Sequence, residues 1–177
     1  LMVSVGSAGK PAPCMVHFNG LDGVKEYLYL CGLPDMLARR GVSILLVDNP
    51  GVGEALRKNG LHNAPEAEKP AGACVDYLET RADVDKTRIG MMALSLGGYH
   101  APRATAFEPR FACCVAWGAN HDWPTRFRKR MAGTLQAQNS VPHYMAHNMW
   151  VLGKNSLEEC AEVIDRLLAV TLDEVQA

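Results

Sequence analysis

The chain has 177 residues, a length that favours a single domain. Apolar residues make up 48% of it and charged residues 21%, so a packed core is expected and an intrinsically disordered protein is excluded. Eighteen basic against 19 acidic residues give a net charge of -1, which leaves no positive field for nucleic acid or an anionic membrane surface.

Neither a signal peptide nor an apolar run long enough to span a membrane is visible, which predicts a cytoplasmic protein. The six cysteines are interpreted as reduced core residues, because most have apolar neighbours. No spacing of cysteine and histidine implies a metal, and none implies a cofactor. The chain opens with Leu1 rather than methionine, so we expect a piece of a longer protein.

Alternating apolar and helical patterns predict the elements of the first half. Residues 12–18 form an apolar run before a cluster of turn formers at 19–23, which predicts a strand and a loop. Residues 24–40 have helical spacing, but Pro34 predicts that the helix is broken or begins there, and Gly41 suits its C-terminal end. Residues 42–47 predict a strand buried on both faces.

The same alternation continues to residue 117. We expect a long surface connection over 51–69, a helix over 71–80, a strand over 89–94, a small-residue helix to about residue 106 and a strand over 111–117. Repeated buried strands and helices predict the α/β class, with a parallel sheet covered by helices on both faces.

The pattern changes after residue 120. A basic stretch and a polar stretch precede a helix expected over about 156–170, for which Ser156 and Glu159 form a capping box. Residues 149–152 fit a short strand about as well as a helix.

The segment from Ala93 to Gly98 joins a buried strand to a helix, which is typical of a nucleophile elbow. Its sharp turn needs small neighbours: Gly97 provides one, whereas Ala93 stands where glycine is usual. The turn would expose Ser95 beside a helix N-terminus, and the Leu96 amide would hold a developing oxyanion. The alternative is that Ser95 only caps the helix.

A second oxyanion donor is expected from the loop after an earlier strand. The turn-forming cluster at 19–23 lies there, and the Leu21 amide is the candidate. A plain turn explains the same glycines.

Four segments together resemble a known family. VHFNGLDGVKE, LLVDNPGVGEALR, DVDKTRIGMMALSLGGYHAPRATAFEPR and CCVAWGANHDW are similar to the α/β-hydrolase group that contains dihydroxypseudooxynicotine hydrolase, fungal polyketide-shortening hydrolases and fermentation-respiration switch esterases. The resemblance covers about residues 12–123. It implies an incomplete α/β-hydrolase fold, with a partial core over 1–122 and a helical lid region over 123–177.

The resemblance also implies roles for individual residues. Ser95 matches the family's nucleophile, and Leu96 matches the residue whose amide completes the oxyanion hole. Asp22 lies in a loop where members have an acidic residue that reaches the substrate, although a loop aspartate also bonds its own backbone. Residues 117–119 would border the pocket or pack in the core. The reaction implied is hydrolysis of a small molecule at an ester or at a carbon-carbon bond next to a ketone.

The rest of the triad is not evident in the sequence. The fold supplies its acid and then its histidine after the serine, yet no strand with an acid follows the lid, and no histidine follows His147. His143 and His147 belong to the lid, and His100 suits a surface or packing role. Asp122, beside His121, is an alternative acid. A fragment is the expectation, with the strand at 113–117 as an uncovered edge that invites aggregation or pairing into a homo-oligomer.

Two functions therefore stay open. The first is a serine hydrolase that forms an acyl-enzyme on Ser95. The second is a non-catalytic binding or regulatory protein of the same fold that has lost its triad. A peptidase shares the elbow, but nothing in the sequence resembles a propeller domain.

Overall fold

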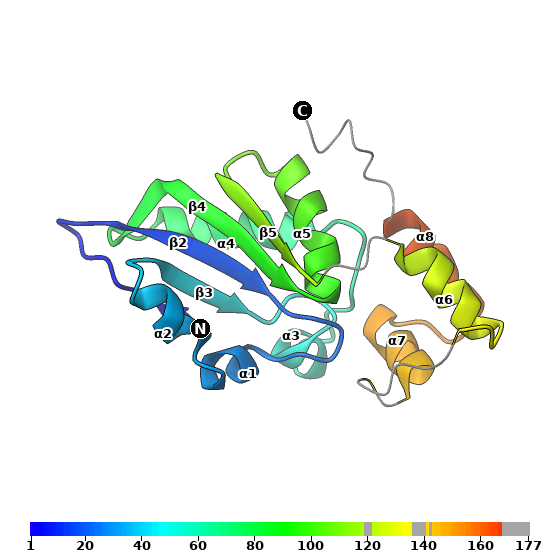
Figure 1. The fold of residues 1–177 in the computed structure, drawn as a ribbon. Helices are drawn as coiled ribbons and strands as arrows, with labels where there is room; N and C mark the ends of the chain where they lie inside the picture. The colour runs from blue at the N-terminus through cyan, green and yellow to red at the C-terminus, as the bar shows by residue number, and fades with distance from the viewer. Residues whose placement is uncertain (119–121, 136–140, 142, 168–177) are drawn as a thin grey trace.

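The fold is built on a mostly parallel sheet. The computed structural model describes residues 1–118, 122–135, 141 and 143–167. The described strands form one sheet in the order β1-β3-β2-β4-β5 (Figure 1). Only β1 runs antiparallel to its neighbour. The strands are β1 (Met2–Val3), β2 (Ala12–Phe18), β3 (Ser43–Val47), β4 (Val84–Leu94) and β5 (Cys113–Trp117).

Helices cover both faces of this sheet, as the sequence predicts (Figure 1). On one face α1 (Lys25–Leu30) and α2 (Leu33–Ala38) pack on Ile44 and Leu46 of β3. On the other, α4 (Glu68–Glu79) and α5 (Leu96–Phe107) pack on Val16, Phe18 and Met91. Because successive side chains of a strand point to opposite faces, a sheet covered twice needs apolar residues at nearly every position.

The helical region before β3 is broken, one of the two expected arrangements. Gly32 separates α1 from α2 with φ +77°, a conformation that glycine adopts without a steric penalty. Pro34 lies in the first turn of α2. Amides in a first turn have no acceptor within the helix, so the missing N–H of proline costs no hydrogen bond there.

The prediction that residues 51–69 form a surface connection is wrong. This segment contains α3 (Gly53–Arg57) and the start of α4. The side chains of Val52, Ala55 and Leu56 are buried, so this short helix packs against the core. Its five residues are too few to show helical periodicity against the polar residues around them.

Three helices follow the sheet: α6 (Trp123–Met131), α7 (Tyr144–Leu152) and α8 (Leu157–Leu167). Figure 1 shows them beyond the carboxyl ends of β2, β4 and β5. Residues 149–152 are helical, and positions 168–170 of the last expected helix lie outside the described residues. The division of the chain at residue 122 stays a prediction.

The capping box at α8 is half formed. Ser156 Oγ accepts a hydrogen bond from the Glu159 amide at 3.2 Å. The Glu159 carboxylate accepts from the amide of Asn155 at 3.0 Å rather than from that of Ser156.

All six cysteines are free thiols, but the expected core placement is wrong for three of them. Cys31, Cys113 and Cys114 are exposed, whereas Cys14 and Cys160 are buried. Cys113 and Cys114 belong to β5, which is an edge strand, and every residue of β5 is exposed. In the described part of the chain, no helix has the length and apolar character needed to cross a membrane.

His17 is a buried titratable group in the central strand β2. It is completely inaccessible to solvent, and neither ring nitrogen has a hydrogen-bond partner among the described residues. Burial lowers its pKa from 6.5 to about 4, because the charged imidazolium loses its hydration. His17 therefore stays neutral in the folded chain at neutral pH.

Acid is expected to destabilise the fold through His17. Between pH 6.5 and about 4 the unfolded chain binds a proton there and the folded chain does not, so stability falls as the pH falls. The full effect is about 3 kcal/mol. We expect His17→Leu to remove this part of the pH dependence in urea denaturation, and to stabilise the neutral protein by ~1 kcal/mol because no unpaired ring nitrogen remains buried.

The matched control is His143→Asn, because the His143 side chain is exposed and asparagine tolerates its positive φ of 55°. This control should keep the acid sensitivity of the parent chain. A His17→Leu chain with the same acid sensitivity as its parent would contradict the prediction.

Candidate active site

Ser95 lies on a strained turn between β4 and α5. Its φ of 57° and ψ of -116° are unusual for a residue with a side chain. The Ser95 amide donates to the Trp117 carbonyl at 2.9 Å, which fixes the turn to the end of β5. Ser95 occupies the N-cap position of α5, but its hydroxyl makes no capping bond. The side chain is exposed, so capping does not explain this serine.

Glycines allow the turn to approach its neighbours closely. A Cβ added to Gly97 would lie 2.5 Å from the Asn19 carbonyl oxygen. A Cβ added to Gly20 would lie 3.0 Å from the Cβ of Ser95 and 3.5 Å from its Oγ. The loop after β2 therefore lies directly against the serine, where the sequence placed the second oxyanion donor.

Polar residues after β3 hold that loop. The Asn19 amide donates to Asn49 Oδ1 at 2.9 Å, and Asn19 Nδ2 donates to the Val47 carbonyl at 3.1 Å. Among the described residues the Leu21 amide donates to no acceptor, so it is available to a ligand. The sequence analysis did not identify Asn49 as a site residue, although polar residues directly after a buried strand often lie at the site of an open α/β sheet.

Asp48 ties together the starts of two helices beside this loop. Its carboxylate accepts from the Lys25 amide at 2.8 Å, the Glu54 amide at 3.0 Å and Lys25 Nζ at 2.7 Å. Burial acts to raise the pKa of Asp48, but these hydrogen bonds outweigh it and the pKa lies below its ordinary value. The buried carboxylate therefore stays charged and fully paired.

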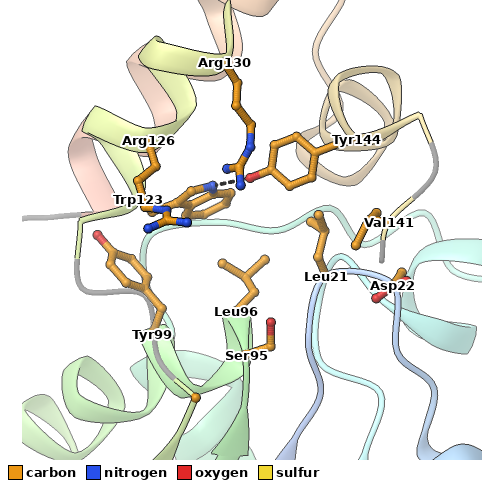
Figure 2. Close-up of a pocket in the computed structure, with 11 residues that line it drawn as sticks. Leu21, Asp22, Ser95, Leu96, Tyr99, Trp123, Arg126, Arg130, Val141 and Tyr144 are labelled. Carbon is orange, nitrogen blue, oxygen red and sulfur yellow. Dashed lines mark hydrogen bonds between the residues drawn. The ribbon is translucent and has the colours of Figure 1, made fainter. Parts of the chain in front are cut away.

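Ser95 opens into a cavity of about 290 Å³ between the sheet and the last helices (Figure 2). Leu21, Asp22, Leu96 and Gly118 line it, so the structure gathers these predicted residues around the serine. Trp117 does not line it, and Ala119 lies outside the described residues. The roles given to Ser95, Leu96, Leu21 and Asp22 stay predictions.

The sequence reading missed the other half of the lining. These residues come from α5, from α6, from position 141 and from the first turn of α7; they are Tyr99, Trp123, Arg126, Arg130, Val141 and Tyr144. A signal for α6 was present, because Trp123, Arg126 and Arg130 recur at the spacing of one helical face.

Helix α7 is bound to the loops of the sheet. His147 Nε2 donates to the Leu21 carbonyl at 3.1 Å. The Asn63 amide donates to the Val151 carbonyl at 2.9 Å, and His62 Nδ1 donates to the Trp150 carbonyl at 3.0 Å. His147, expected only as a lid residue, is thus a direct support of the loop that carries Leu21.

The described residues bring no general base to Ser95. No side chain among them hydrogen-bonds Ser95 Oγ, Asp122 is exposed, and His121 lies outside the described part. His100 lines a different cavity, of about 340 Å³, where its Nε2 accepts from Asn63 Nδ2 at 3.0 Å. His100 is 3% exposed, so of the two expected roles it has the packing one, and burial lowers its pKa to about 4.

Gly97→Ala is expected to destabilise the chain by about 2 kcal/mol, because the new methyl group must displace backbone rather than a flexible side chain. It would lie 2.5 Å from the Asn19 oxygen and 2.9 Å from the Phe18 oxygen. Gly9→Ala is the control, since a Cβ there meets nothing within 4 Å. Urea denaturation measures both, and equal midpoints would show that the contact is looser than described.

Sequence comparisons find relatives that are named hydrolases, while no family model matches the chain. The chain is 33% identical over 132 residues to hydrolase acrC of Aspergillus aculeatus, covering 72% of this chain and 30% of that protein. It is 32% identical over 112 residues to 2,6-dihydropseudooxynicotine hydrolase of Paenarthrobacter nicotinovorans, covering 63% and 29%. The matches therefore span about 30% of the length of these curated relatives.

Solved structures have the same fold. The crystal structure of 2,6-dihydroxy-pseudo-oxynicotine hydrolase superposes with a TM-score of 0.77 at 24% identity, over 94% of this chain and 43% of that one. AbyA5 superposes with a TM-score of 0.70 at 24% identity, over 96% and 46%. Together with the parallel sheet and the serine turn, these comparisons show that the chain belongs to the α/β-hydrolase group.

Proposed function

We propose that the chain carries the nucleophile of a serine hydrolase that acts on a small molecule. Ser95 Oγ attacks a carbonyl carbon, and its proton passes to the leaving group as the bond from that carbon to oxygen or carbon breaks. Water then cleaves the acyl-enzyme. The observation that supports this most is an exposed serine hydroxyl on a strained turn at the wall of a cavity.

Two backbone amides are proposed to hold the oxyanion. The Leu96 amide is in the first turn of α5, where helix N–H groups lack intrahelical acceptors. The Leu21 amide comes from the facing loop. Each donor of this kind contributes roughly a hundredfold to turnover. Asp22 lines the same cavity and is proposed to contact the substrate. A cytoplasmic location completes the proposal.

A non-catalytic binding protein is the second candidate. Two observations favour it: no described acid or imidazole bonds Ser95 Oγ, and Ala93 stands where the elbow motif has glycine. Such a protein would bind the ligand in the cavity without forming a covalent bond to the serine.

A fluorophosphonate probe separates the two candidates on the full polypeptide. We expect stoichiometric labelling that maps to Ser95 by mass spectrometry and is lost in Ser95→Ala. Ser156→Ala, which changes the capping serine of α8, should label normally. An unlabelled chain, or labelling that survives Ser95→Ala, would remove the hydrolase proposal in favour of the binding protein.

His147→Ala is expected to slow the labelling of Ser95 about fivefold, because the Leu21 loop loses a hydrogen bond worth roughly 1 kcal/mol. His147→Gln should recover part of the rate, since its amide also donates. His143→Asn, a change at the start of the same helix, should label at the parent rate. Equal rates for His147→Ala and the parent, at unchanged melting temperature, would contradict a positioning role.

A further inference from the structure

Helix α6 places two arginines at the cavity that contains Ser95. Arg126 and Arg130 line it together with Trp123, one and two turns along the same face of the helix (Figure 2). Figure 2 shows both guanidinium groups directed from α6 toward the floor formed by Leu96 and Ser95. Asp22, on the opposite wall, is the one acidic residue among the described lining residues. The charged lining is therefore positive on the α6 side.

These arginines differ from their neighbour on the same helix. Arg128 does not line the cavity and pairs with Asp165 of α8. Arg126 forms no ion pair with any carboxylate of the described residues, although its side chain reaches the cavity. The Arg130 guanidinium stacks on the Tyr144 ring, and the distance between Arg130 Cζ and the centroid of that ring is 4.5 Å. That stacking fixes its position at the wall.

The Tyr144 hydroxyl adds a neutral hydrogen-bond donor to the α6 side of the cavity. Trp123 Nε1 donates to the Tyr144 hydroxyl oxygen at 2.9 Å, so the hydroxyl proton of Tyr144 must be donated elsewhere. The wall thus presents N–H and O–H groups and few acceptors. A ligand that satisfies it needs oxygen atoms that accept several hydrogen bonds.

We propose that this cavity binds substrates with an anionic oxygen group, a carboxylate or an ionised phenol or enol, held by Arg126 and Arg130. The hydrocarbon between that group and the reacting carbonyl packs on Leu96, Trp123 and Val141. A cavity of about 290 Å³ suits a small organic acid. The reaction of such a substrate rests on the proposed function. The binding preference does not, because an anion can bind to the arginines without Ser95 reacting.

The preference follows from the chemistry of guanidinium. Its planar fork donates two parallel hydrogen bonds to a carboxylate, and charge-assisted bonds of this kind are about twice as strong as neutral ones. A neutral amide of the same shape offers one acceptor and no charge. Each arginine is expected to contribute about a tenfold preference for the anion, which decreases at high salt because Arg126 is exposed.

Calorimetric titration of the full chain with cinnamate and with cinnamamide tests the preference, because the two probes share shape and apolar area. We expect cinnamate to bind about a hundredfold more tightly, since each arginine contributes about tenfold. R126Q and R130Q should each reduce this ratio about tenfold. para-Nitrophenol, titrated across its own ionisation, shows whether a phenolate is bound as well as a carboxylate.

K129Q is the matched control: it removes the same charge from α6, but Lys129 does not line the cavity. Equal binding of acid and amide, no binding of cinnamate at about 10 mM, or an equal effect of K129Q and R126Q would each overturn the proposal. If R130Q lowers the melting temperature, R126Q alone decides the test. Fluorophosphonate labelling of Ser95 is scored separately, so its failure would reject the reaction and leave the binding result valid.

Discussion

The candidate site depends on the parallel pairing of β2 with β4. Phe18 is paired with Ala93, so the residues that follow each strand leave the sheet at the same level. Gly20 then lies against Ser95, where a side chain would be crowded, and Gly97 lies against the Asn19 carbonyl at a distance that leaves no room for a Cβ. The separation between the serine and the loop amides is therefore set by backbone and by sheet register, neither of which changes without breaking the central pair of strands.

The end of β3 supplies the polar residues that make this arrangement rigid. Asn49 holds the Asn19 amide, and Asp48 holds the start of α1 and the start of α3. A buried carboxylate is costly unless it is paired, and Asp48 is paired with Lys25 and bonded by two amides. Three neighbouring strands thus end at one place, where their loops fix one another, as is general at the carboxyl edge of open α/β sheets.

The sequence predicted what depends on apolar periodicity and on the serine motif. The four parallel strands were found because each contains a run of apolar residues, but β4 begins five residues earlier than expected, since its first half is the polar segment around Asp85. Helix α6 was not predicted, because its described buried side chains are few and lie among four basic residues. Ser95 and Leu21 followed from local motifs. Arg126 did not, because a basic stretch in a sequence indicates a solvated face until the fold shows a cavity beside it.

The contacts that α6 and α7 make at this cavity have a joint consequence for the proposed reaction. Helix α7 is bonded to the Leu21 carbonyl, and α6 presents Arg126 to the same cavity. An anionic substrate that spans from Ser95 to Arg126 would connect the sheet to α6, so its binding energy would be available to hold the reacting carbonyl against the loop amides. Positive charge in a cavity partly closed to water also favours the negative charge that develops at that carbonyl. Binding of the distant anion and stabilisation of the oxyanion would then act on the same loop, through His147 on one side and through the substrate on the other.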